Sequence, residues 1–385
     1  MVTLKQYGLD GVINMKWGVF SLSQIPDLSR VPVAFEEDFL FFQRAEAVGY
    51  DTVWLAEHLF SNYGLVTSTQ VLAAAVAKCT TTIKIGTAVV VIPFNHPLRT
   101  ASDFALVDVI SKGRLKFGAG RAYQPHEFLG LDIPMEQSRE MYAEGLDIII
   151  KAWTNEKVDY DGEFWKIRDP VEVLPKPFQK PHPPIYQACI TPDSFRTAAQ
   201  QGLHLQLASP FSYRTYRENW VAKLAESVAV YEEECIRCGH DPKASERMML
   251  LPFFVSETSE EAQQTYGEYV EWFYSKVTAN QKSVSGQEPV VKGYELTMSE
   301  ARKTLTGGYL NFEKLYQHGA AIADDPETCA AKLINLSERL GITEFVLWFN
   351  IAGMPTQQSI RAMELAMKEV IPLVNSAVST RVAAE

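Results

Sequence analysis

The chain alternates between short apolar runs and longer stretches in which apolar residues recur every three or four positions. Short apolar runs are typical of strands covered on both faces, and the longer spacing is typical of amphipathic helices. The run IKIGTAVVVI is the clearest example of a strand. We therefore predict eight strands, at residues 15–20, 52–55, 83–92, 114–121, 185–190, 203–208, 248–255 and 344–349.

Amphipathic helices are predicted between these strands and after the last one. They cover residues 35–48, 69–78, 98–110, 137–153, 192 onward, about 213–238, 258–276, 326–340 and 356–377. This alternation, in a single domain of residues 1–385, predicts an α/β fold whose parallel sheet closes as a (β/α)8 TIM barrel. An open doubly wound sheet has the same alternation. However, the dinucleotide fingerprint G-x-G-x-x-G is absent, since Gly118 and Gly120 are followed by Tyr123, and we expect no nicotinamide site.

Two segments break the alternation. Residues 154–183 are rich in Pro, Asp and Gly, which predicts a surface insertion, with a hairpin, before the fifth strand. Residues 277–320 are polar and contain glycine, with only a weak helical pattern, which predicts a long loop after the seventh strand.

Charge and composition exclude several classes of partner. The formal net charge of −11 argues against nucleic acid or an anionic membrane as the main partner. The longest apolar runs are too short to cross a bilayer, and the first twenty residues lack the apolar core of a signal peptide. Five sparse cysteines suggest reduced thiols in a cytoplasm. Cys235 and Cys238 form a C-x-x-C without a second ligand pair, so we expect structural thiols and no metal site.

Polar residues follow several of the predicted strands, and barrel active sites lie at the C-terminal ends of strands. Glu57 and His58 come directly after the second strand, where they either cap the strand or do chemistry. A lone histidine in such a place is more often structural than catalytic. The other residues at strand ends are Ala88, Val89, Asn95, His96, Arg121, Tyr123, His126, Glu127, Thr191, Ser194 and Trp348.

The start of the helix at 192 has the composition of an anion site. Thr191 fits the N-cap, Pro192 the first helical position and Ser194 the third. Free backbone N–H groups at such a helix start suit a phosphate, and Arg121 could add a guanidinium. The alternative is that Thr191 only caps the helix, which its spacing alone favours, and Asp193 counts mildly against an anion.

Several stretches, taken together and in order, resemble the bacterial luciferase-like flavin-dependent monooxygenases. The likeness covers roughly residues 14–375 and is closer to the luciferase catalytic subunit than to the deazaflavin-dependent branch. The matching stretches are DTVWLAEHLFSNYGL, IKIGTAVVVIPFNHPLR, SKGRLKFGAGR, MEQSREMYAEGLD and PKPFQKPHPPIY.

The resemblance implies a TIM barrel that works with reduced FMN and O2. His58 matches the catalytic histidine of the family, and Glu127 an acidic position near the flavin ring. Ala88 and Val89 would pass their backbone against that ring through a non-proline cis peptide. The residues that would hold the FMN phosphate are Arg121, Arg139, Thr191 and Ser194.

A mechanism follows from the resemblance. Reduced FMN and O2 would form a flavin C4a-(hydro)peroxide, and one oxygen atom would pass to an apolar organic substrate by Baeyer–Villiger insertion or hydroxylation. His58 suits proton control because the ordinary pKa of histidine is about 6.5. A separate NAD(P)H:flavin reductase would supply the flavin. The family further suggests a homodimer and a mobile lid at residues 277–320.

Aromatic residues near strand ends would make the substrate pocket apolar, and the candidates are Trp17, Phe60, Trp272 and Trp348. Taken singly, such residues are more often core than pocket. Leu59, Gly120 and Ile190 depart from the luciferases, which puts light emission in doubt and is expected to open the pocket. Two other hypotheses stay open, namely hydride transfer with a deazaflavin and a flavin-binding protein or partner subunit without turnover. Retention of His58 argues against the latter.

Overall fold

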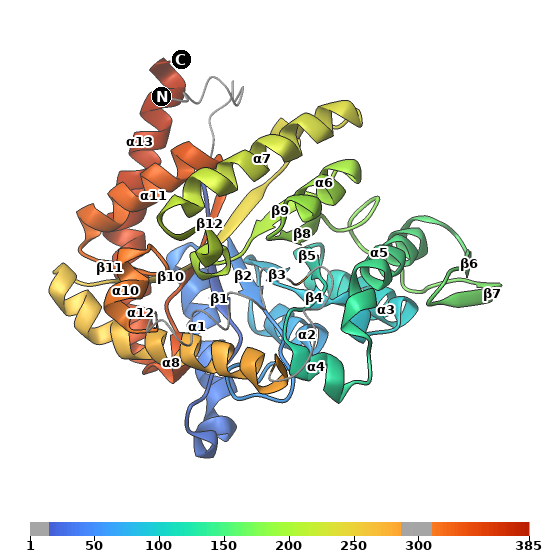
Figure 1. Ribbon diagram of the computed structural model, residues 1–385, viewed down its shortest axis with the longest axis horizontal. Helices are drawn as coiled ribbons and strands as arrows, with labels where there is room; N and C mark the ends of the chain where they lie inside the picture. Colours follow the sequence, from blue (N-terminus) through green and yellow to red (C-terminus); the bar gives the residue numbers. More distant parts are fainter. Residues whose placement is uncertain (1–14, 286–293, 295–309, 385) are drawn as a thin grey trace.

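The computed structural model describes residues 15–285, 294 and 310–384. Its centre is a closed barrel of eight parallel strands, which confirms the predicted TIM barrel (Figure 1). The strands pair in the order β1, β2, β3, β5, β8, β9, β10 and β12, and β12 pairs with β1 to close the ring. Their bounds are β1 Lys16–Ser21, β2 Thr52–Leu55, β3 Lys84–Thr87, β5 Leu115–Gly120, β8 Ile185–Cys189, β9 His204–Leu207, β10 Arg247–Val255 and β12 Glu344–Trp348.

Helices surround the barrel on its outside (Figure 1). The principal ones are α1 Val31–Val48, α2 Thr69–Cys79, α3 Pro97–Ser111, α5 Ser138–Thr154, α6 Pro192–Gln200, α7 Trp220–Arg237, α8 Ser259–Ser285, α11 Pro326–Leu340, α12 Thr356–Leu365 and α13 Ile371–Ala384. The last predicted helix is divided by a π-helical segment at Ala366–Val370, and α7 begins late because Pro210–Asn219 is a 3₁₀ helix. The strand predicted at 83–92 is interrupted at Ala88–Val89, and its second part is the short strand β4 Val90–Val91. Elements that the sequence pattern missed are α4 Pro125–Gly130, α10 Phe312–Gln317 and β11 Ile322–Asp324.

The insertion before the fifth barrel strand is the predicted hairpin, formed by β6 Val158–Asp161 and β7 Lys166–Val171. The carboxylate of Glu144 on α5 accepts hydrogen bonds from the backbone N–H groups at the hairpin turn, including that of Trp165 at 2.8 Å. The predicted loop at 277–320 is partly wrong, because α8 continues to Ser285. Residues 286–293 and 295–309 lie outside the described residues, so a lid there stays a prediction.

Trp54 fills the barrel interior, and glycines on the two neighbouring strands make room for it. A Cβ atom on Gly86 of β3 would lie 2.2 Å from the indole of Trp54, and one on Gly18 of β1 would lie 2.9 Å from it. Across the barrel, the ring of Tyr186 meets Trp54 edge to face at 5.2 Å. These residues therefore fix how β1, β2, β3 and β8 align around one aromatic core.

Buried charges close the N-terminal end of the barrel. Trp54 Nε1 donates to Glu344 Oε1 at 2.8 Å, and Lys116 Nζ donates to Glu344 Oε2 at 2.7 Å and to Glu246 Oε2 at 2.9 Å. Burial alone would lower the pKa of Lys116, but Glu344 and Glu246 outweigh burial and raise it. Although burial opposes the effect, the charge of Lys116 holds the pKa of Glu246 at about 2. The N-terminal end of the barrel is thus filled by side chains. The candidate active site lies at the opposite end, where the strands end, and this end is called the mouth of the barrel.

A buried carboxylate fastens α1 to the other end of the barrel. Asp38 accepts hydrogen bonds from the hydroxyl groups of Ser21, the last residue of β1, and Ser23, and from Asn350 Nδ2 after β12 at 3.2 Å. Burial raises the pKa of Asp38 to about 6, although these hydrogen bonds oppose the rise.

We expect Asp38 to make stability depend on pH. Its folded pKa of about 6 lies above the ordinary 3.8, so the stabilising contribution of the protonated form is complete below pH 4 and is lost as pH rises through 6. An asparagine side chain at this position would carry no charge at any pH. Relative to the wild type, Asp38→Asn should therefore gain on the order of 2–3 kcal/mol in free energy of unfolding between pH 4 and 7.

Urea unfolding at several pH values measures this difference. Asp169→Asn, at an exposed position on β7, is the matched control and should show no such trend. A difference between Asp38→Asn and the wild type that stays constant with pH would contradict the assignment.

Candidate active site

Glu57 turns out to be a structural residue of the mouth. Its Oε2 accepts hydrogen bonds from the backbone N–H and the hydroxyl of Thr69, both at 2.9 Å, and its Oε1 accepts from the backbone N–H of Val91 at 2.9 Å. Burial raises the pKa of Glu57, with these hydrogen bonds opposing the rise. Glu57 therefore fastens the end of β2 to the start of α2 and to β4.

His58, the next residue, has partners that point to chemistry. Its Nδ1 lies 2.9 Å from Glu127 Oε1 and 2.7 Å from the hydroxyl oxygen of Tyr63. The backbone N–H of Leu59 also donates to Glu127 Oε1, at 2.8 Å. The side chain of Glu127 is 1% exposed and that of His58 is 11% exposed. Since Nδ1 is occupied, His58 can exchange a proton with a reactant only through Nε2.

The short helix α4 carries Glu127 to His58, which the sequence did not predict. His126, beside Glu127, bonds to the carbonyl oxygen of Leu59 at 3.0 Å, so α4 and the loop after β2 are joined twice. The resemblance places Glu127 near the flavin ring. Its second oxygen, Oε2, is buried and has no hydrogen-bond partner in the described part of the chain. One oxygen thus orients His58, and the other stays available.

The end of β3 forms another wall of the mouth. The peptide bond between Ala88 and Val89 is cis, as the resemblance implies, and both residues are half-buried. The expectation that Gly120 opens the pocket is wrong, because a Cβ atom there would lie 2.7 Å from Val89 Cγ2. Val89 occupies that space, and glycine is required for the close approach.

The start of α6 has an available polar group. The hydroxyl of Thr191 is buried without a partner within the described residues, and it makes no side-chain capping bond to α6. The hydroxyl of Ser194, by contrast, donates to the Thr191 carbonyl at 2.6 Å and accepts from the Ile190 N–H at 3.1 Å. Of the two hydroxyl groups, that of Thr191 is therefore the one still available to a ligand.

Two arginines are available to this helix start. Arg139 Nη1 lies 3.6 Å from Asp193 Oδ2, a loose contact between exposed groups. The guanidinium of Arg121 packs 4.9 Å from the ring centre of Tyr294, and no carboxylate pairs with it in residues 15–285 and 310–384. Burial lowers the pKa of Arg121, and the charge of Arg139 lowers it further. Two neighbouring cations, a free hydroxyl and a helix N-terminus together fit a phosphate dianion such as that of FMN.

Aromatic side chains wall the mouth beside His58. Trp348 lies 4.9 Å from Phe20 and 4.6 Å from Phe273, and Phe273 lies 5.9 Å from Tyr63, between ring centres. The indole N–H of Trp348 is buried and has no partner in the described part of the chain. Trp348 thus lies at the C-terminal end of β12 among these rings, and Phe273 is an aromatic neighbour that the sequence did not single out. Trp272, the predicted residue next to it, is half-buried and lies under Lys276, so its place in a pocket stays a prediction.

Two predicted pocket residues do not reach the mouth. The indole of Trp17 faces outward, where its Nε1 donates to Asn375 Oδ1 on α13 at 3.3 Å. Phe60 is 62% exposed and lies against Gly130 of α4 on the surface. The alternation of β1 explains the first error, because Gly18 and Phe20 face inward and Trp17 must face outward.

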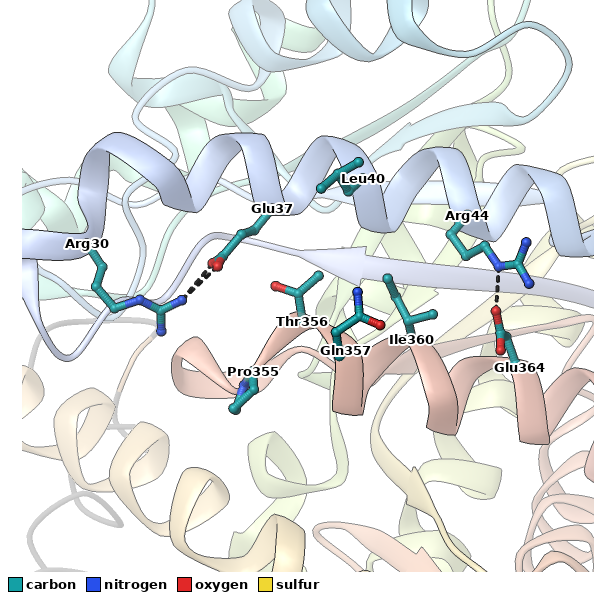
Figure 2. Close-up of a pocket in the computed structure, with 9 residues that line it drawn as sticks. All are labelled: Arg30, Glu37, Leu40, Arg44, Pro355, Thr356, Gln357, Ile360 and Glu364. Atoms are coloured by element: carbon teal, nitrogen blue, oxygen red, sulfur yellow. Dashed lines mark hydrogen bonds and ion pairs between the residues drawn. The ribbon is translucent and has the colours of Figure 1, made fainter.

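A separate groove of about 780 Å³ lies between α1 and α12, on the outside of the barrel (Figure 2). Ion pairs join Arg30 to Glu37 and Arg44 to Glu364 along it, so its charges are satisfied internally. This groove offers no group for chemistry. Within the described ranges, no cluster of His, Cys, Asp or Glu could hold a metal ion, and no helix is long and apolar enough to span a membrane.

The chain is similar to members of a known protein family. Residues 15–344 match the model of the luciferase-like monooxygenase family. The alkanal monooxygenase alpha chain of the Kryptophanaron alfredi symbiont is 27% identical over 93% of this chain and 98% of its own. The oxygenase component of the flavin-dependent trigonelline monooxygenase of Acinetobacter baylyi is 24% identical over 93% of this chain and 95% of its own.

Among solved structures, the monooxygenase RslO1 from Streptomyces bottropensis superposes with a TM-score of 0.77 and 26% identity, over 93% of this chain and 99% of that one. The family match and the structural similarity each cover most of the chain. The protein therefore belongs to the luciferase-like monooxygenase family.

Proposed function

We propose that this protein is the oxygenase component of a two-component monooxygenase, which uses FMNH2 and O2 to oxygenate an apolar organic substrate. The observation that carries the proposal is His58, held at Nδ1 by Glu127 and Tyr63 and placed at the barrel mouth. When bound, reduced FMN supplies the electrons that activate O2. The remaining chemistry belongs to side chains of this chain.

Binding of the cofactor is assigned to the two sides of the mouth. Arg121, Arg139 and Thr191 would hold the phosphate by charge-assisted hydrogen bonds, and Ser194 would shape the loop that presents Thr191. The half-buried pair Ala88–Val89 supplies backbone at the edge of the mouth. Loss of water from such a site strengthens each of these contacts.

Proton control is assigned to His58. Glu127 fixes the ring through Nδ1, so Nε2 can hold or release a proton where the reaction needs one. The wall of Phe20, Phe273 and Trp348 keeps water away from that position and suits an apolar substrate. Whether oxygen enters by Baeyer–Villiger insertion or hydroxylation depends on that substrate.

A separate NAD(P)H:flavin reductase is proposed as the source of FMNH2. The G-x-G-x-x-G fingerprint is absent from this sequence, and the Acinetobacter baylyi relative is described as an oxygenase component. Reduced flavin would then reach the mouth by diffusion.

A homodimer is proposed on the basis of one surface. Leu106, Val109 and Ile110 are exposed on α3, and their spacing of three and four residues puts them on one face. Phe178 of the insertion is also exposed and lies against Gly113, directly after α3. An apolar patch of this kind indicates a protein interface.

The proposed activity is tested by mixing the protein with reduced FMN without oxygen, adding oxygenated buffer and following absorbance by stopped flow. We expect an absorbance band distinct from that of oxidised FMN, which lasts longer than in free flavin and decays faster with substrate. Immediate return to oxidised FMN at the rate of free flavin would favour deazaflavin-dependent hydride transfer or a non-catalytic flavin protein.

His58→Ala should lower turnover about 10²–10⁴-fold, because proton transfer through Nε2 is lost. In His58→Ala the affinity for FMN should change little.

Arg121→Met should weaken FMN binding about 10–100-fold, because a charged hydrogen bond to phosphate is lost. Isothermal titration and steady-state kinetics separate the two effects, with His240→Ala at the other end of the barrel as control. Loss of FMN binding in His58→Ala would show that His58 is structural.

Leu106→Asp should convert the dimer to a monomer, because a carboxylate would be buried in an apolar interface. Size-exclusion chromatography with light scattering gives the mass directly. Leu373→Asp on α13 is the matched control, since Leu373 is 44% exposed and Leu106 is 46% exposed. An unchanged dimer in Leu106→Asp would move the interface elsewhere.

A further inference from the structure

Two oxygen atoms compete for one ring nitrogen of His58. Glu127 Oε1 lies 2.9 Å from Nδ1, and the Tyr63 hydroxyl oxygen lies 2.7 Å from the same atom. A neutral imidazole nitrogen carries either one hydrogen or one lone pair, so it needs either an acceptor or a donor. The two neighbours supply one of each kind.

Glu127 serves the form with hydrogen on Nδ1. Its Oε1 already accepts a hydrogen bond from the Leu59 N–H at 2.8 Å, which identifies that oxygen as an acceptor. In this form Nε2 is bare and acts as a base. If Nδ1 lost its hydrogen, its lone pair would face a carboxylate oxygen, which is unfavourable without a donor nearby.

Tyr63 is that donor. Its side chain is fully buried. Burial raises the pKa of Tyr63 well above its ordinary value, and the charges of Tyr123 and Glu127 add to the rise, so the hydroxyl keeps its proton at working pH. The hydroxyl can rotate and donate to a bare Nδ1, or accept when Nδ1 carries hydrogen.

We propose that Tyr63 is a positioning residue that allows His58 to adopt both neutral tautomers, with Glu127 stabilising hydrogen on Nδ1 and Tyr63 stabilising hydrogen on Nε2. Exchange takes up one proton from water at Nε2 and releases one from Nδ1 to water by way of the flanking Glu127 and Tyr63 oxygens, so the charge of His58 is unchanged. The partial exposure of His58, 11%, gives water access. Nε2 can then accept a proton in one step and donate one in another.

Four side chains near His58 influence which of its two ring nitrogens carries the hydrogen. Tyr63 packs on the imidazole with 4.5 Å between ring centres, and Tyr123 meets it edge-on at 5.7 Å. Glu127 comes from α4, and the carboxylate of Glu57 adds a second negative charge nearby. A carboxylate oxygen can only accept, so of the two groups that contact Nδ1 only the Tyr63 hydroxyl can donate to a bare nitrogen.

The tautomer equilibrium can be measured without flavin. In the ligand-free protein with ¹⁵N-labelled histidine, the signals of His58 are identified by their loss in His58→Ala. We expect the wild type to give Nδ1 and Nε2 shifts averaged between the two tautomers. Tyr63→Phe, which removes only the hydroxyl oxygen, should shift both signals to those of the Nδ1–H form.

Two further variants keep the test decisive. Glu127→Gln removes the negative charge beside Nδ1 and should shift the signals the opposite way, toward the Nε2–H form. Tyr50→Phe removes another buried hydroxyl, which donates to the Met363 carbonyl at 3.0 Å, and should leave the His58 signals unchanged. Identical His58 signals in the wild type and in Tyr63→Phe would overturn the proposal.

The catalytic consequence rests on the proposed function. In Tyr63→Phe, turnover should fall about tenfold or more and its pH profile should narrow, because Nε2 no longer donates from a neutral ring. FMN affinity should stay within about twofold, since Tyr63 acts through His58. If the wild type proves not to be an oxygenase while the NMR shifts appear as expected, the proposed function fails and the tautomer assignment stands.

Discussion

The ion pair of Lys116 with Glu344, buried inside the barrel, is the contact that joins the strands beneath the candidate active site. Both groups bond within a layer that includes Trp54, which donates to the same Glu344 carboxylate. His58 follows Trp54 by four residues, Gly120 follows Lys116 by four, and Trp348 follows Glu344 by four. These contacts tie β2, β5 and β12 together below the segments that carry His58, Gly120 and Trp348.

The main effect of this polar layer is to specify how neighbouring strands align, and its contribution to stability is smaller. Burying two charges costs nearly as much as their attraction returns, so an ion pair of this kind specifies an arrangement more than it strengthens one. Trp54 needs glycine at Gly18 and Gly86, and it needs Glu344 for its N–H. A strand shifted by one residue would point each of these side chains to the wrong face.

The apolar pattern of the sequence predicted the barrel strands, but it did not predict the contacts between side chains at the mouth. Short, mostly apolar runs locate the eight barrel strands, since burial on both faces leaves little choice of residue. The six-residue helix α4 is too short to show a period, so the contact of Glu127 with His58 could not be inferred. Trp272 and Phe273 are consecutive on a helix and point about 100° apart, so only the tertiary structure decides which one faces the mouth.

Leu59 differs from the residue that the luciferases have at this position, but its contacts here are made by its backbone. Its N–H donates to Glu127 Oε1 and its carbonyl bonds to His126, and neither contact depends on the side chain. The same backbone therefore holds α4 in place whichever residue stands there. Glu127 in turn holds His58, while Arg121, six residues earlier in the chain, reaches the anion side of the mouth. The segment after β5 thus supplies both Arg121, which is proposed to bind the phosphate, and Glu127, which contacts His58, so the proposed cofactor site and the proposed proton site share one segment of the chain.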